Sequence, residues 1–173
     1  MAIKIIEFKA RVNNIHELEN KLKSFEPDFI GEDHQVDTYF NVEKGRLKLR
    51  EGNIENSLIW YQRDNVAGAK RSDVILYKHV ANKELKTILE KLHGILVVVD
   101  KRRKIYFIGN IKFHFDTVAG LGEFIEVEAI DNNGDVSIDI LEEQCRKYAA
   151  LFEIKKENYV AGSYSDMVMI EKQ

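Results

Sequence analysis

Basic residues recur at alternate positions in several segments of this sequence. Because successive side chains of an extended strand point to opposite faces, residues of one parity share a face. The shared-face sets are Lys9 with Arg11, Arg46 with Lys48 and Arg50, Lys101 with Arg103, and Arg63 with Tyr61. Guanidinium groups match phosphate oxygens through paired hydrogen bonds, and ammonium groups add compact positive charge. These segments therefore carry side chains suited to binding phosphate.

Carboxylates are grouped in the same way on two later segments. Glu126 and Glu128 share a face opposite apolar neighbours, and Asp116 shares a face with Lys112 and His114. Hard oxygen donors of this kind suit Mg²⁺ or Mn²⁺, either of which also bridges phosphate oxygens. The acidic segments therefore predict a divalent-metal site.

A polar face that simply meets water is the ordinary explanation for each strand taken alone. The sorting by charge, with almost no Ser, Thr or Gln among these residues, favours a site instead. If the sheet curls so that the charged faces converge, like charges repel each other unless an anion and a cation are supplied from outside. A triphosphate with a divalent cation meets both needs. No glycine-rich nucleotide loop is present, and Gly120-Leu121-Gly122 indicates a tight turn.

Turn residues divide the segments that must position these side chains. Hairpin turns are predicted where Gly, Asn and Asp cluster between segments of alternating polarity. The clusters are Glu51-Gly52-Asn53, Asp64-Asn65, Gly109-Asn110 and Asp131-Asn132-Asn133-Gly134. Many short strands joined in this way favour a mainly antiparallel sheet.

Helical spacing of apolar residues is found in three stretches. Asn14 and Asn82 fit the N-caps of two helices, the second closed by Gly94, and a third begins near Ser137. Cys145 lies on the apolar stripe of the third and is interpreted as a core residue. The segment 158–170 is compatible with either a short helix or an irregular cover. Helices together with an antiparallel sheet place the chain in the α+β class.

Length and composition favour one domain covering residues 1–173, since 45% of the residues are hydrophobic and only Pro27 interrupts the chain as a proline. A net charge of −3 gives no support for a nucleic-acid partner. The single cysteine excludes an internal disulfide, and the run Ile95–Val99 is too short to span a bilayer. We therefore expect a soluble, cytoplasmic protein with no membrane partner, and a homodimer is compatible with the sequence.

Several motifs together resemble those of one known family. The segment Ile5-Ile6-Glu7-Phe8-Lys9 is similar to a Glu-x-Glu-x-Lys signature in which Ile5 stands at the first Glu position. The other matching segments are 35–40, 45–51, 61–63, 101–106 and 114–128. Together they resemble the CYTH domain proteins, or triphosphate tunnel metalloenzymes, particularly the class IV adenylyl cyclase-like branch.

This resemblance implies an eight-stranded antiparallel β-tunnel, a closed barrel with helices packed on its outside. It implies that the phosphates are held by Lys9, Arg11, Lys48, Arg50, Arg63, Lys101 and Arg103. The metal side would be Glu7, Asp116, Glu126 and Glu128, binding Mg²⁺ or Mn²⁺. Lys9, Arg50, Arg63 and Arg103 would also be catalytic, because they would stabilise charge that develops on phosphate.

Two reactions fit the motifs equally well. An adenylyl cyclase would convert ATP to cyclic AMP and pyrophosphate, whereas a hydrolase would cleave tripolyphosphate, thiamine triphosphate or a nucleoside triphosphate. The resemblance to the cyclase branch places the cyclase first. Because Ile5 removes one metal ligand of the signature, a triphosphate-binding module with weak catalysis is a further alternative.

Three other polar residues have more ordinary expected roles. His114 beside Asp116 is interpreted as a hydrogen-bond partner, and Asp37 is expected to brace the fold. Tyr164 is a candidate for closing one end of the tunnel.

Overall fold

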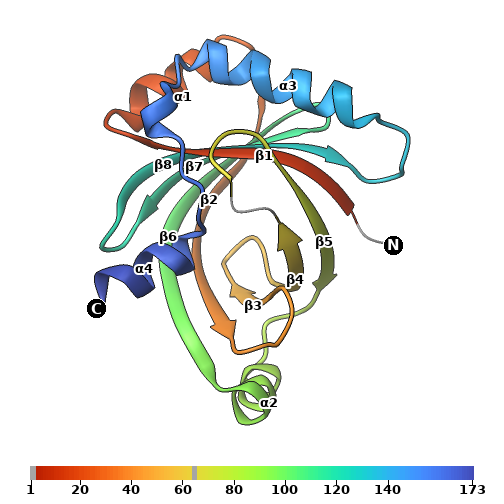
Figure 1. The fold of residues 1–173 in the computed structure, drawn as a ribbon, viewed down its shortest axis with the longest axis vertical. Helices are drawn as coiled ribbons and strands as arrows, with labels where there is room; N and C mark the ends of the chain where they lie inside the picture. Colours follow the sequence, from red (N-terminus) through yellow and green to blue (C-terminus); the bar gives the residue numbers. More distant parts are fainter. Residues whose placement is uncertain (1–2, 64–65) are drawn as a thin grey trace.

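The computed structural model describes residues 3–63 and 66–173 and shows a barrel of antiparallel strands (Figure 1). Within these residues, eight strands close in the order β1-β5-β4-β3-β2-β6-β7-β8. Their bounds are β1 Ile3–Val12, β2 Asp28–Phe40, β3 Arg46–Glu51, β4 Ser57–Arg63, β5 Lys70–Lys78, β6 Ile95–Ile108, β7 Ile111–Val118 and β8 Gly122–Asp131. The predicted α+β tunnel is therefore confirmed.

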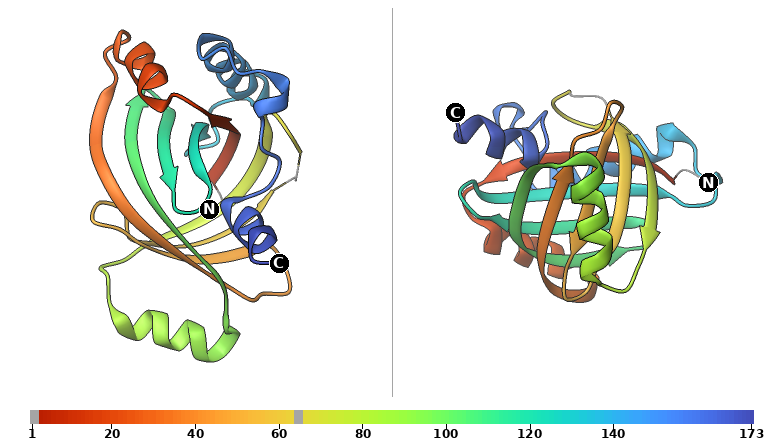
Figure 2. Two further views of the ribbon diagram at one scale, coloured as in Figure 1. Left: turned by 90° about the vertical axis from the view of Figure 1, so that its left-hand side faces the viewer. Right: turned by 90° about the horizontal axis from the view of Figure 1, so that it is seen from below.

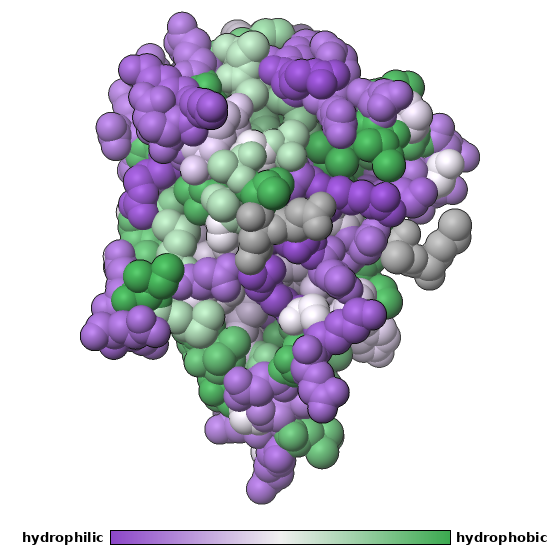
Figure 3. Space-filling view, viewed as in Figure 1, coloured by the Kyte–Doolittle hydropathy of each residue, from purple (hydrophilic) through white to green (hydrophobic). Residues whose placement is uncertain are grey.

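Alternation along β1, β7 and β8 separates an apolar outer face from a charged inner face. Phe8, Phe113 and Val127 are buried on the outer face beneath the helices α1 (Ile15–Lys23) and α3 (Ile138–Leu151). Figures 1 and 2 show these two helices side by side over this part of the barrel. In Figure 3, hydrophilic residues lie over both helices, with hydrophobic residues between and below them. Because the helices cover the apolar faces of these strands, the charged faces point to the interior of the barrel.

Local sequence signals fix the helix ends as predicted. The Asn14 side chain accepts a hydrogen bond from the amide of Glu17, and Asn82 caps α2 (Lys83–His93) in the same manner. Ser137 caps α3, and Gly94 ends α2 with a φ of 69°, a conformation that glycine adopts without steric cost. The helix α2 lies at the end of the barrel opposite α1 and α3 (Figure 2).

The C-terminal segment, left open between two interpretations, contains helices. A 3₁₀ turn, η1 (Lys156–Asn158), is followed by α4 (Tyr164–Glu171), whose N-terminus carries a capping box between Ser163 and Asp166. The helix α4 packs beside β6. Cys145 is a residue of α3 and is buried on the face of that helix that packs into the core, as predicted.

One predicted hairpin turn is wrong. Residues 131–134 connect β8 to α3 rather than to another strand, because Asp131 Oδ1 accepts hydrogen bonds from the amides of Asn133, Gly134 and Asp135. The turns at 51–53, 109–110 and 120–122 do join consecutive antiparallel strands. The predicted turn at Asp64-Asn65 lies outside the described residues. In the part of the chain that the structure describes, no helix combines the length and apolarity needed to cross a membrane.

Candidate functional site

A cavity of about 680 Å³ occupies the interior of the barrel. Predicted phosphate and metal ligands from five strands, β1, β3, β4, β6 and β8, contribute to its wall. Those that line it are Glu7, Lys9, Lys48, Arg50, Arg63, Lys101, Arg103, Glu126 and Glu128. Opposite charges from distant parts of the sequence are therefore gathered inside one closed sheet.

Asp37 on β2 organises one group of cations. Its carboxylate accepts two hydrogen bonds from Arg50, at 2.9 and 3.0 Å, and lies 3.0 Å from Lys48 Nζ and 2.8 Å from Lys101 Nζ. Burial alone would raise the pKa of Asp37, but these cations hold it well below the ordinary value. The burial of Lys101 lowers its own pKa to about 7. Asp37 thus braces the site as well as the fold.

A second group centres on Arg103. Its guanidinium donates to both oxygens of Asp116, at 2.7 and 2.6 Å, and to Glu126 at 3.1 Å. Tyr164 donates to Asp116 at 2.6 Å, and Lys9 Nζ lies 3.8 Å from the centre of the Tyr164 ring. The C-terminal segment therefore forms part of the cavity wall through Tyr164. That Tyr164 closes one end of the tunnel stays a prediction.

Arg63 carries hydrogen-bond donors that have no partner. Its Nη1 donates to Glu7 Oε1 at 2.6 Å, yet its buried Nε and Nη2 lack a partner among the described residues. An unsatisfied buried donor on a charged group costs several kcal/mol in general, so an acceptor at this position is strongly favoured. A phosphate oxygen would be an acceptor of this kind and would bring negative charge to the guanidinium.

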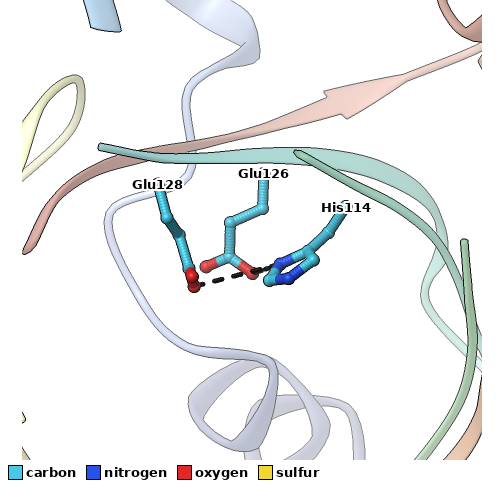
Figure 4. Close-up of side chains that lie close together, drawn as sticks. All are labelled: His114, Glu126 and Glu128. Carbon is cyan, nitrogen blue, oxygen red and sulfur yellow. Dashed lines mark hydrogen bonds and ion pairs between the residues drawn. The ribbon is translucent and has the colours of Figure 1, made fainter. Parts of the chain in front are cut away.

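His114, Glu126 and Glu128 form a group that could hold a metal ion. One potential ligand atom of each lies within 4.8 Å of the others, and all three side chains point to a common position (Figure 4). Burial and the neighbouring Glu126 raise the pKa of Glu128 to about 7, whereas burial lowers the pKa of His114 to about 3. A divalent cation would relieve the repulsion between the carboxylates, and neutral imidazole is the form that binds metal. The donor set therefore fits Mg²⁺ or Mn²⁺.

Three of the predicted phosphate and metal ligands have other partners and lie apart from the group formed by His114, Glu126 and Glu128. Asp116 is buried against Arg103 and Tyr164 and is not among the residues lining the cavity. Glu7 lines the cavity, but its carboxylate is paired with Arg63. Arg11 is exposed, donates to the carbonyl oxygen of Leu121 and stacks on the ring of Phe124, so it too lies apart from the cavity lining.

Other residues of the cavity were not predicted as ligands. His114 pairs with Glu126 in the β7–β8 register, so strand parity and pairing would have indicated its place beside the carboxylates. Lys112 lies on the same face of β7 as His114, and its Nζ lies 2.5 Å from Glu55 Oε1. Glu55 also contacts Arg50. Glu55 belongs to the connection between β3 and β4, where no periodic pattern reveals which way a side chain points.

Comparisons with known proteins agree with this architecture. "Putative adenylate cyclase MJ0240" of Methanocaldococcus jannaschii is 26% identical over 174 residues, which cover 94% of this chain and 97% of that protein. The PH1012 protein of Pyrococcus horikoshii has the same fold, with a TM-score of 0.77 and 22% identity over 96% of this chain and 98% of its own. "Putative adenylyl cyclase HpAC1" from Hippeastrum also shares the fold, with a TM-score of 0.61 and 12% identity over 99% and 96% of the two chains. A family model for the CYTH domain matches residues 4–164, and the chain therefore belongs to the CYTH domain family.

Proposed function

We propose that this protein is a divalent-metal-dependent enzyme that binds a triphosphate inside the tunnel and cleaves one of its phosphoanhydride bonds. One observation carries the proposal: Arg63, which has two buried donors without a partner among the described residues, lines the same cavity as the His114, Glu126 and Glu128 group. A polyanion and a cation would each complete one part of this arrangement. Two donors of Arg63 lack a partner among the described residues, and burial together with the neighbouring Glu126 raises the pKa of Glu128.

The residues of the wall divide into two proposed roles. Lys9, Arg50, Arg63 and Arg103 stabilise the charge that develops on phosphate, while Lys48 and Lys101 hold the remaining phosphate oxygens. Asp116 orients Arg103 through two hydrogen bonds, and Asp37 orients Arg50 in the same way. Arg11 lies outside the cavity lining, so any contact it makes with phosphate would be at the margin of the site.

Glu126, Glu128 and His114 would hold Mg²⁺ or Mn²⁺, with Glu7 nearby on β1, where it is the register partner of Glu128. When bound, the cation supplies positive charge that offsets the negative charge of the phosphate oxygens. The protein contributes the fixed carboxylate positions and a wall of cations on the opposite strands. Alignment and charge neutralisation account for most of the catalysis in reactions of this type.

Cyclisation of ATP is the reaction that we place first, since the Methanocaldococcus jannaschii relative is named as an adenylate cyclase candidate. In this reaction the ribose 3′-oxygen forms a bond to the α-phosphorus. The bond between the α-phosphorus and the α,β-bridging oxygen breaks, pyrophosphate leaves with those electrons, and the hydroxyl proton passes to solvent or a basic group. The tunnel would serve by holding the three phosphates in line with the attacking oxygen.

Hydrolysis of a triphosphate is the second candidate. The Hippeastrum protein, which shares the fold, is described as having a dominant triphosphatase activity. Water would then attack a terminal phosphorus, and the same cations would stabilise the leaving group. Both reactions need the same wall of charges and differ in where the nucleophile lies.

Product analysis separates the two reactions. Purified protein is incubated with Mg²⁺ or Mn²⁺ and with ATP, tripolyphosphate or thiamine triphosphate, and products are resolved by chromatography. Cyclic AMP with an equal amount of pyrophosphate supports the cyclase, and orthophosphate without cyclic AMP supports the hydrolase. Binding without any product in either metal would contradict an enzymatic role and leave a triphosphate-binding module.

A further inference from the structure

One part of the cavity wall is apolar. It is formed by side chains of four strands that point inward beside the charged region. These residues are Ile3 and Ile5 on β1, Ile59 on β4, Val74 and Leu76 on β5, and Ile130 on β8. Ile5 and Ile59 are 8% and 6% exposed, whereas Leu76 is 39% exposed, so the patch is enclosed at Ile5 and Ile59 and meets solvent at Leu76.

Strand pairing places this patch directly beside the proposed metal group. Ile5 pairs with Ile130 in the register of β1 and β8, two positions from the pair formed by Glu7 and Glu128. Two residues along a strand span about 7 Å, which is close to the length of one or two linked phosphate groups. A group attached to a triphosphate held by the cations can therefore reach the apolar patch.

A single unsatisfied hydroxyl lies at the same level of the barrel. Ser72 is 1% exposed and lines the cavity, and its Oγ has no hydrogen-bond partner among the described residues. It pairs with Ile5 on one side and with Arg63 on the other. Because buried hydroxyls are normally hydrogen-bonded, this one is available to a ligand that enters the cavity.

We propose that this wall is a subsite for an uncharged organic group carried by the triphosphate, and that it makes the protein select organic triphosphates over inorganic tripolyphosphate. The proposal rests on the function proposed above and adds the class of substrate. Apolar area on the organic group is removed from water against Ile5, Ile59 and Val74, while the Ser72 hydroxyl bonds one of its polar atoms. Inorganic tripolyphosphate has no group that could occupy this wall.

The first test removes the hydroxyl alone. Binding of ATP and of tripolyphosphate is measured by calorimetry with a chelator present, so that no turnover occurs. Ser72→Ala should weaken ATP about fivefold and tripolyphosphate less than about twofold, as expected for one lost hydrogen bond. Since the hydroxyl has no partner in the part of the chain that the structure describes, the variant should keep its melting temperature. Ser24→Ala, on the exposed end of α1, is the matched control and should change neither affinity. An equal loss for both ligands would place Ser72 on the phosphates and overturn the proposal.

The second test alters the apolar surface. Val74→Thr keeps the side-chain shape and should weaken ATP about threefold to tenfold while leaving tripolyphosphate unchanged. Ile75→Thr is the control, because Ile75 is the next residue of β5 and is 54% exposed. If the wild type binds tripolyphosphate but ATP responds to neither variant, the subsite is disproved while the proposed function survives. If the wild type binds neither ligand, either with the chelator or with Mg²⁺ present, the proposed function itself fails.

Discussion

Arg63 Nη1 donates a hydrogen bond of 2.6 Å to Glu7 Oε1, which connects β4 to β1 across the inside of the barrel. In residues 3–63 and 66–173, the pairing leaves two of the three guanidinium nitrogens buried without a partner. Glu7 therefore holds the Arg63 side chain in place but accepts a hydrogen bond from only one of its nitrogens. The positions of the remaining donors are fixed before any ligand binds. Such preorganisation reduces the entropy that binding would otherwise cost.

Arg63→Lys should weaken tripolyphosphate binding by about 2 to 3 kcal/mol, because a lysine can keep the contact with Glu7 but cannot reproduce the guanidinium fork. Calorimetry with a chelator present measures the affinity. Arg102→Lys is a suitable control, since Arg102 is on β6 with a side chain that is 65% exposed. Unchanged affinity in Arg63→Lys would show that the unpartnered donors do not contact phosphate.

Asp37→Asn should lower the free energy of unfolding by about 3 kcal/mol or more, because it removes the charge that Arg50, Lys48 and Lys101 share. Tripolyphosphate should then stabilise this variant more than it stabilises the wild type, since the polyanion replaces part of the lost negative charge. Thermal unfolding with and without tripolyphosphate gives both values. The same stabilisation in the two proteins would mean that these cations do not face the bound anion.

The charged face of each strand could be predicted from the sequence because alternation determines it residue by residue. Lys9, Lys101 and Arg103 follow that rule, and all three line the cavity. Arg11 obeys the same alternation but lies near the end of β1, where it reaches the turn at Leu121 instead. Parity thus gives the face of a side chain, and position along the strand decides whether that face is still inside the barrel.

Pairing between strands was the information that the sequence lacked. Asp116 and His114 have the same parity, yet Asp116 pairs with Arg103 while His114 lies opposite Glu126. Which of the two lies beside Glu126 and Glu128 depends on the register of the strands, and no local sequence pattern specifies that register. Glu55 was missed for a related reason, because residues between strands have no alternating pattern to follow.

Metal affinity should rise with pH and level off above about pH 7. Glu126 has a lowered pKa and His114 a pKa of about 3, so Glu128, with a pKa of about 7, is the member of this group that titrates near neutrality. Below that pH a cation must displace the proton of Glu128, so Mn²⁺ affinity should fall about tenfold per pH unit. Calorimetry at several pH values measures the slope.

Glu128→Gln is the control for this slope and should bind Mn²⁺ weakly with little pH dependence. The same raised pKa has a consequence for stability without metal. Because folded Glu128 binds its proton more tightly than unfolded Glu128, stability should decrease as the pH rises from the ordinary value of 4.5 to about 7. If the Mn²⁺ affinity of the wild type stays constant from about pH 5 to 8, within an error small enough to detect a tenfold change, then Glu128 is not a ligand.

Tyr164→Phe should loosen the C-terminal helix α4 without removing the ring beneath Lys9. The variant loses only the hydrogen bond to Asp116, which is worth about 1 kcal/mol. Amide hydrogen exchange in residues 164–171 should become faster, while exchange in α3 stays the same. Tyr77→Phe is the control because Tyr77 is 65% exposed. Equal exchange in wild type and Tyr164→Phe would show that this hydrogen bond does not hold α4 against the barrel.

Ile5→Glu places a carboxylate in the apolar wall, two residues from Glu7 on the same inner face of β1. Without metal this change should destabilise the protein by about 2 kcal/mol or more, because a buried charge has no partner there. Mn²⁺ should reverse much of the loss if the new carboxylate binds a second cation, and the number of Mn²⁺ ions bound with tripolyphosphate should rise from one to about two per chain. Ile5→Gln is the matched control, because Gln has nearly the same size and shape as Glu but carries no charge. Mn²⁺ should not restore the stability of this variant. If both variants respond to Mn²⁺ alike, or if the wild type already binds a second ion, then Ile5 is not what limits the metal content of this tunnel.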